Sequence, residues 1–505
     1  MFEQGKDQPA VPAAPKRASG RGRCIVAAAV AAFLGAIGVV IGSVAPAGAA
    51  PIFYVIDPTD APDASLDGRC ASTHLGLCTL RAAIQEAEFA GGGEVVLSAG
   101  IGDYQLTIPA GDEASSASAN NAPSNLTGDL DITTSITVTG SGPDVSVIDG
   151  MDAVRIFDVH RTGFLRLRGV TLQHGKGDYD SATGHRHGGA IHNHGGISLD
   201  HVAVVDSSSS EPGWGGGGIT NAGAPVVASA LLQNVTVARN SANLRGGGIE
   251  NTGDLRMLNV TIAENSAPAG QGGGIFTGAN STSTTDGLVA RNASGGDCAS
   301  TGGTVQSGGY NLQGDGTCGF NQPTDRSGDP GFEPGLFNGK PIFYPLLPTS
   351  QAVDTGSPLA CPATDVRGAL RPQDGDGDGV ALCDIGSYEL EAAGQAALSI
   401  HDTSVRERDY LTSDARFRVS LSQRAEHTVT VRYATEEGTA HAGSDFRPKS
   451  GKLTFERGDR HEFFAVKVRG DHIAEPDETF KVRLFAPTGA VIDDDVATAT
   501  IIDND

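Results

Sequence analysis

The chain has 505 residues and a formal net charge of −24, and it contains 70 glycines but a single tryptophan. This composition is typical of a thin interior filled by small aliphatic side chains and disfavours one thick globular core. An acidic surface repels phosphate backbones, so we expect no nucleic-acid partner. An anionic polysaccharide would also be repelled unless a cation such as Ca²⁺ bridged it.

The N-terminal segment has the pattern of an export signal. Basic residues precede an apolar run from Ile25 to Val44, and small residues with an A-x-A sequence follow up to Ala49. We therefore predict that residues 1–49 are a signal peptide and that the protein is extracellular or on the cell surface. An uncleaved membrane anchor is the alternative, because the run is close to spanning length. No second run of this kind follows.

Removal of the signal also removes Cys24 and leaves six cysteines. An even number in an exported chain predicts disulfides, although the sequence leaves several pairings open. Metal ligation is the weaker interpretation because no C-x-x-C spacing occurs. Proximity along the chain favours the pairs Cys70 with Cys78, Cys298 with Cys318, and Cys361 with Cys383.

Residues 51–100 begin with a strand-like run, IFYVI, and continue into an amphipathic helix from Leu80. Thr79 is placed to cap this helix, and Leu80, Ala83, Ile84 and Ala87 share one face. The sequence CTLRAAIQEAEF resembles the CSLREA domain, which implies an N-terminal cap on an exported β-helix protein. It departs from that family at Ala83, where glutamate is usual. A helix in this place can cover the open end of a repeat array.

Residues 101–297 contain a glycine-rich phrase that occurs four times. Its isoleucines, Ile191, Ile219, Ile249 and Ile275, are spaced by 28, 30 and 26 residues, and short β-branched runs follow the phrase. This period predicts one coil per repeat in an all-β, right-handed parallel β-helix of the pectin-lyase-like kind. Two asparagine series share the period, and we expect each to hydrogen-bond between coils: Asn193, Asn221, Asn251, and Asn240, Asn265, Asn292.

Two further resemblances cover the rest of the chain. Residues 298–390, with DVRG, RP and CDIGSYE, resemble the choice-of-anchor Q region, which implies the C-terminal part of the solenoid in a surface protein. Residues 397–505 alternate apolar and polar positions in strand-sized pieces, as in a β-sandwich. The phrases TVTVRYATEEGTAHAGSDF and VRGDHIAEPDETF within them resemble the Calx-beta domain, an immunoglobulin-like sandwich.

The Calx-beta resemblance implies Ca²⁺ binding by loops at one end of the sandwich. Hard divalent cations take six to eight oxygens, and crowded carboxylates repel each other without one. The sequence departs from calcium-binding members at Gly470, often Asp, and at Asn504, so we expect fewer ions or an affinity on the order of 0.1–1 mM. A sandwich that has lost the ion is the alternative. The family's ligands map onto Glu407, Asp445, Asp471, Glu475, Glu478, Asp503 and Asp505.

The run DGDGDGV, from Asp374 to Val380, is a second candidate calcium site. Asp374, Asp376 and Asp378 alternate as in the opening of an EF-hand loop, but the twelfth position is Ile385 and not a bidentate glutamate. Asp384 is the nearest substitute. A solvated acidic turn is the alternative interpretation.

Other polar residues receive no catalytic role. His185, His187, His192 and His194 have a spacing that can bind zinc, but Thr220 and Glu250 replace His192 in later repeats, so we interpret the histidines as a solvated outer face. Several acids and Arg155 could in principle serve a polysaccharide lyase or glycoside hydrolase. We find no pectate-lyase or polygalacturonase motif around these acids, which are Asp129, Asp131, Asp149, Asp152 and Asp158.

The sequence therefore predicts a surface protein that binds calcium and works by adhesion to a polysaccharide, an extracellular matrix or a cell-surface component. A lyase or hydrolase acting on an acidic polysaccharide and a passive structural spacer are the alternatives. The sequence leaves enzyme activity open while favouring a binding role, and we expect no membrane contact beyond the signal segment.

Overall fold

The computed structural model describes residues 50–504 except 100, 110–124, 178–186, 210–214, 224–226, 281, 293, 334–342, 392–395, 410–411, 426–427 and 457. Residues 50–505 form one compact unit. The predicted signal peptide, His185 and Asp505 lie outside the described residues. Within the described ranges, no helix is both long and apolar enough to cross a membrane.

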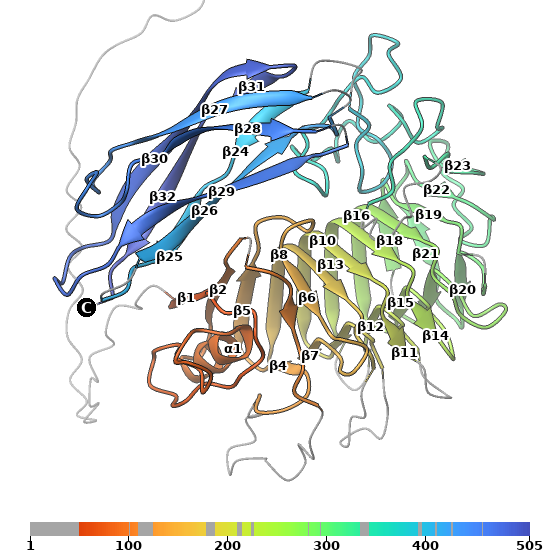
Figure 1. Ribbon diagram of the computed structural model, residues 1–505. Coiled ribbons are helices and arrows are strands. Elements are labelled where there is room, and N and C mark those ends of the chain that lie inside the picture. The colour runs from red at the N-terminus through yellow and green to blue at the C-terminus, as the bar shows by residue number, and fades with distance from the viewer. Residues whose placement is uncertain are drawn as a thin grey trace, which may run out of the picture. The chain divides into compact units, whose positions relative to one another are not determined.

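The first part of the unit is built from parallel sheets, and we call residues 52–327 the parallel-sheet region (Figure 1). Among the described residues, fourteen strands form its long sheet. Ten lie on one path: β1 (Ile52–Val55), β2 (Gly93–Leu97), β5 (Ser135–Thr139), β8 (Phe164–Gln173), β10 (Gly196–Val205), β13 (Ser229–Ala238), β16 (Asp254–Ala263), β19 (Leu288–Ala290), β22 (Leu312–Gln313) and β23 (Arg326–Ser327). Four join beside it: β3 (Tyr104–Gln105), β6 (Val147–Asp149), β18 (Thr282–Thr285) and β21 (Val305–Ser307).

A second parallel sheet is built from short strands, four of which begin at the isoleucines of the glycine-rich phrase. Its seven described strands are β4 (Leu130–Ile132), β7 (Phe157–Val159), β9 (Ile191–Asn193), β12 (Ile219–Asn221), β15 (Ile249–Asn251), β17 (Ile275–Thr277) and β20 (Cys298–Ser300). A two-stranded sheet joins β11 (Ser208–Ser209) to β14 (Ser241–Ala242).

The repeat seen in the sequence is the repeat of the structure. Ile219 pairs with Ile191 and Ile249, and Ile249 pairs with Ile275, so equivalent residues of successive copies are neighbours. These isoleucines are buried in one aliphatic core that fills the parallel-sheet region. The first glycine of each copy has φ between 62° and 68°, a conformation that side chains with a Cβ rarely adopt.

Both asparagine series form hydrogen-bonded ladders, as predicted. The amide of Asn193 donates to Asn221 at 2.7 Å, and Asn221 donates to Asn251 at 2.8 Å. In the other series, Asn265 accepts from Asn240 at 3.0 Å and donates to Asn292 at 3.1 Å. All of these side chains are buried, so they satisfy turn groups that water cannot reach.

Helix α1 (Leu80–Phe89) covers one end of this core, as the sequence predicted (Figure 1). The Thr79 hydroxyl accepts the N–H of Ala82 at 3.2 Å and caps the helix. Arg81 is fully buried, where it pairs with Asp60 at 2.6 Å and donates to the carbonyl of Gly128 at 2.7 Å. This arginine therefore ties the helix to the loop that precedes residues 130–132.

The three predicted disulfides, Cys70–Cys78, Cys298–Cys318 and Cys361–Cys383, are present. The last one lies in a segment of few regular elements, residues 343–391, which packs onto outer side chains of the long sheet. Ile385 joins Ala203, Ala238 and Ala263 in a separate apolar cluster. The N–H of Gly386 donates to the carbonyl of Asp286 at 2.9 Å. The segment thus lies along β10, β13 and β16.

The C-terminal part is a two-sheet sandwich with a core of its own. The first sheet contains β24 (Ala397–Ile400), β26 (Thr412–Leu421), β29 (His461–Arg469) and β31 (Val491–Asp494). The second contains β25 (Thr403–Arg406), β27 (Val429–Glu436), β28 (Ser450–Phe455), β30 (Glu478–Thr488) and β32 (Val496–Ile502). Alternate residues of these strands are buried, in agreement with the apolar and polar alternation of the sequence.

Candidate metal site

Strand ends bring most of the predicted calcium ligands to one edge of the sandwich. Arg406, the last residue of β25, pairs with Ile502, the last residue of β32. Glu478, the first residue of β30, pairs with Ile501. The residues just beyond these ends, Glu407 and Asp503, therefore lie at the same edge as the loop that precedes β30.

Three carboxylates meet at this edge: Asp445, Glu475 and Glu478 each offer an oxygen within 4.8 Å of the others. Asp445 closes a turn by accepting the N–H of His441 at 2.6 Å, and its carbonyl accepts the N–H of Arg469 at the end of β29. We call Asp445, Glu475 and Glu478 the acidic triad.

The triad is electrostatically crowded. Desolvation, followed by the nearby carboxylates of Asp445 and Glu475, raises the pKa of Glu478 to about 7. Burial also acts to raise the pKa of Asp445, but the backbone N–H of His441 and other hydrogen bonds lower it overall. A divalent cation among these oxygens would relieve the carboxylate repulsion that contributes to the raised pKa of Glu478.

Three further predicted ligands, Glu407, Asp471 and Asp503, lie at this edge and are not part of the triad. Asp471 accepts the N–H of Ile473 at 2.7 Å, and Glu407 is 9% exposed. One carboxylate oxygen of Asp503 is buried and has no hydrogen-bond partner among the described residues. Such an oxygen is costly to bury unless a cation or an unseen partner satisfies it, so its environment fits an oxygen-liganded metal.

Two acids at this edge were missed in the sequence. Asp477 accepts the N–H of Asp503 at 3.3 Å, and Asp409 accepts from the amide of Asn504 at 2.6 Å. Both follow predicted ligands by two residues, in the segments RERD and EPDE. Asn504, interpreted as a lost ligand, thus orients one of these carboxylates.

The DGDGDGV loop forms a different group from the predicted one. Asp374 and Asp376 lie within 4.8 Å of Asp354, which comes from outside the motif. Asp354 accepts the N–H groups of Gly375 at 2.9 Å and Asp376 at 3.1 Å. Asp378 bonds the N–H of Val380 at 2.8 Å and is not part of the group. These contacts close turns, and the carboxylates of Asp354, Asp374 and Asp376 also form a group that could hold an ion.

Asp384, which the sequence suggested as a substitute for the EF-hand glutamate, is not part of the carboxylate group in this loop. It is fully buried and accepts the N–H groups of Asp354 at 2.8 Å and Leu390 at 2.5 Å. Burial, followed by the charge of Glu389, raises its pKa well above the usual value. Asp384 is therefore part of the interior that holds residues 343–391.

The histidine prediction was wrong for His192, which is 1% exposed and not solvated. In the seven-stranded parallel sheet, His192 lies beside Asp158 on one neighbouring strand and Thr220 on the other. The guanidinium of Arg155 lies 2.9 Å from the Nδ1 atom of His192. Burial lowers the pKa of His192 despite the nearby Asp158. The side chain is thus part of a covered polar row on the outer side of the short strands.

Some of the acids considered for catalysis converge around Arg155. This arginine bonds Asp129 at 2.6 Å and lies 3.4 Å from Asp158, and its side chain is 3% exposed. Burial raises the pKa of Asp129 to about 7, although Arg155 opposes the shift. Burial acts to lower the pKa of Arg155, but Asp158 and Asp129 raise it above its usual value. Asp149 instead contacts Gln173 and His174, and Asp152 is exposed.

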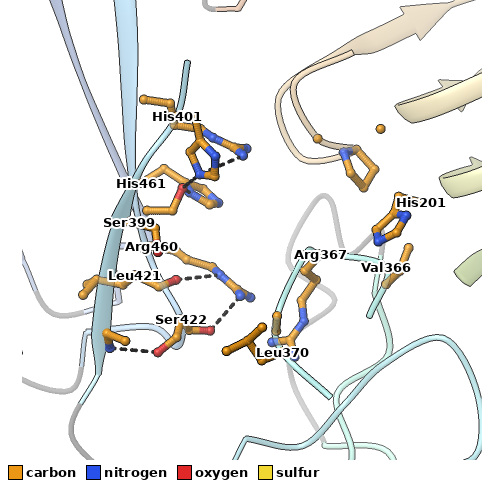
Figure 2. A pocket seen from close by; sticks show the side chains of 18 of the residues that line it. His201, Val366, Arg367, Leu370, Ser399, His401, Leu421, Ser422, Arg460 and His461 are labelled. Atoms are coloured by element: carbon orange, nitrogen blue, oxygen red, sulfur yellow. Dashed lines mark hydrogen bonds between the residues drawn. The ribbon is translucent and has the colours of Figure 1, made fainter. Parts of the chain in front are cut away.

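A cavity of about 530 Å³ is lined by residues of the sandwich and of segments 141–201 and 366–391 (Figure 2). Arg460 donates to the carbonyls of Leu421 at 3.2 Å and Ser422 at 2.7 Å (Figure 2). Arg367 pairs with Asp365 at 2.6 Å and with Glu391 at 3.0 Å. Because these cations already have partners, we assign the cavity no ligand.

The fold and this edge define an all-β protein with parallel sheets and a C-terminal Calx-beta domain. Residues 392–505 match the family described as the Calx-beta domain. Over 78 residues the chain is 40% identical to the sodium/calcium exchanger Calx of Drosophila melanogaster, which covers 15% of this chain and 8% of the relative. Over 95 residues it is 34% identical to human sodium/calcium exchanger 2, covering 15% and 10%. The chain therefore spans about a tenth or less of these relatives.

Solved structures were also found for this part. The crystal structure of the apo-form Calx CBD1 domain is 31% identical, with a TM-score of 0.21, and the match covers 22% of this chain and all of that one. A structure titled as the calcium binding domain CBD12 of CALX1.1 is 31% identical, with a TM-score of 0.20, covering 21% and 46%.

Proposed function

We propose that this protein is an exported surface protein in which a right-handed parallel β-helix carries a calcium-binding Calx-beta domain. The register of the parallel sheets supports the β-helix, because each glycine-rich repeat supplies one short strand and then a long strand, which is split into β18 and β19 in the last repeat. Right-handed crossovers are nearly universal between parallel strands. Three disulfides support export, since such bonds persist in oxidising compartments.

The observation that carries calcium binding is the acidic triad, whose three carboxylate oxygens lie within 4.8 Å of one another. The names of the relatives, sodium/calcium exchangers, point to the same ion. Asp445, Glu475 and Glu478 supply oxygens of the type that Ca²⁺ prefers, and Glu407, Asp471 and Asp503 lie in loops that can add to them. Bound Ca²⁺ would join these loops and stiffen this edge.

Isothermal calorimetry of the whole exported chain with Ca²⁺ tests this proposal. We expect binding on the order of 0.1–1 mM, and its loss or marked weakening in Glu478→Gln. Glu456→Gln is the matched control, because Glu456 is an exposed glutamate of the same sandwich outside the triad. No calcium heat from the wild type, or equal binding by both variants, would reject the proposal.

We further propose that the work of the protein is adhesion to a polysaccharide, a matrix or a cell-surface component, with Ca²⁺ bridging the acidic surface to anionic ligands. Retention on immobilised acidic and neutral polysaccharides, with and without Ca²⁺, tests this step. Calcium-dependent retention without turnover supports adhesion. Failure to bind any polysaccharide or cell surface favours a spacer.

A lyase or hydrolase is a weaker candidate. The arginine base of a lyase must reach substrate and lose its proton, whereas Arg155 is buried and ion-paired. Its carboxylate partners raise its pKa, which opposes deprotonation. Unsaturated products or new reducing ends in the polysaccharide experiment would overturn this assignment.

A further inference from the structure

Two acidic side chains lie next to each other on the outer side of the seven-stranded parallel sheet. Asp131 in β4 pairs with Asp158 in β7, while their neighbours Leu130 and Phe157 enter the core. Adjacent strands of a sheet are about 4.8 Å apart. The two carboxylates therefore lie side by side, in a place where like charges repel.

An imidazole completes this group. His160 follows β7 directly, and its backbone N–H donates to the carbonyl of Ile132 at 2.9 Å. That contact holds the ring over β4, with Nε2 at 2.8 Å from Oδ1 of Asp131. Asp131, Asp158 and His160 each offer a ligand atom, and these atoms all lie within 4.8 Å of one another.

Two of the oxygens in this group are buried without a hydrogen bond. The side chain of Asp131 is only 6% exposed, and its Oδ2 atom has no hydrogen-bond partner among the described residues. The same is true of Oδ1 of Asp158, which lies 3.7 Å from Nδ1 of His192, beyond hydrogen-bond distance. A buried carboxylate oxygen normally has a donor or a cation.

From this geometry we propose that Asp131, Asp158 and His160 bind a divalent transition-metal ion, with Zn²⁺ as the best fit. Two carboxylates and one imidazole are a ligand set that Zn²⁺ accepts, whereas Ca²⁺ takes six to eight oxygens. His160 is 43% exposed on its side chain, which leaves an entry path from solvent. Arg155, 3.4 Å from the other oxygen of Asp158, orients that carboxylate.

Equilibrium binding of Zn²⁺ to the whole exported chain, with millimolar Ca²⁺ present to occupy the sandwich, tests the site. We expect His160→Gln and Asp131→Asn each to lower the number of tightly bound ions by one. Co²⁺ bound in place of Zn²⁺ gives a visible absorption that should weaken in the same variants. Melting curves establish that each variant is folded.

His174→Gln is the matched control. His174 is 39% exposed and pairs with Asp149 at 3.1 Å, so it is a similar histidine and carboxylate pair, but it belongs to no three-ligand group among the described residues. This variant should bind as many ions as the wild type. The proposal is overturned if the wild type binds no Zn²⁺, or if His160→Gln and Asp131→Asn bind it with unchanged number and affinity.

Discussion

A Cβ atom placed on Gly470 would overlap the backbone carbonyl of Arg408. Gly470 follows β29, and Arg408 lies in the loop after β25, so these loops touch at the candidate calcium edge. Calcium-binding members of the Calx-beta family often carry aspartate at this position. Here the backbone of Arg408 fills the space that such a side chain needs, so an aspartate fits only if one of the two loops shifts.

Placing aspartate at position 470 should therefore destabilise the fold. We expect Gly470→Asp to lower stability without strengthening calcium binding, and Gly470→Ala to lower it similarly, by about 1–3 kcal/mol for overpacking. Urea unfolding measures the change. Gly177→Ala is the control, because the nearest atom to its Cβ would be Ser209 Oγ at 3.6 Å. Tighter calcium binding by Gly470→Asp at unchanged stability would show that the loop opens freely.

Asp286 should make stability depend on pH. It is fully buried and accepts the N–H of Ser357 at 2.7 Å, and burial raises its pKa to about 7. The folded protein thus holds a proton that the unfolded chain releases near pH 4, so this carboxyl destabilises the fold progressively as pH rises from about 4 to 7.

Asp286→Asn removes this titration. We expect the variant to lose less stability than the wild type between pH 5 and pH 8, and a difference of a few kcal/mol follows from about 1.4 kcal/mol per pH unit. Urea unfolding at several pH values provides the measurement. Identical pH profiles for the two proteins would show that Asp286 ionises normally.

The stability of the fold should depend on each hydrogen bond of the ladder formed by Asn240, Asn265 and Asn292. Asn265 accepts the backbone N–H of Asn240 at 2.9 Å and donates to the carbonyl of Val237 at 2.9 Å. Asn265→Ala leaves both groups buried and unpaired, which should cost roughly 2–3 kcal/mol. Asn321→Ala, at an exposed position, is the control. Equal melting temperatures for the two variants would contradict a structural role for the ladder.

Most of the scaffold could be predicted because its cause is local and repeated. Spacing alone aligned Ile191, Ile219 and Ile249, and the asparagines followed the same period. Asn234 and Asn259 lie in glycosylation sequons, but each is 1% exposed, which agrees with a role in the repeat. The Thr79 cap and the cysteine pairs likewise connect residues close in sequence.

What could not be predicted depends on contacts between distant segments. Strand alternation showed that His192 leaves the core, but it could not show that Arg155 lies over it. Asp354 joins Asp374 and Asp376 from twenty residues away. The Calx-beta resemblance supplied the acidic triad together with Asp471 and Glu407, which lie outside the group of three at this edge. The overlap of Gly470 with Arg408 arises from two loops, and neither loop reveals it alone.

The melting temperature of the whole chain with and without Ca²⁺ tests the central claim most directly. For a dissociation constant of about 0.1–1 mM, 10 mM Ca²⁺ should stabilise the fold by roughly 1.4–2.7 kcal/mol. We predict a higher melting temperature in the wild type and in Glu456→Gln, and little or no rise in Glu478→Gln or Asp445→Asn. An unchanged melting temperature in the wild type, or an equal rise in all four proteins, would contradict calcium binding by the acidic triad.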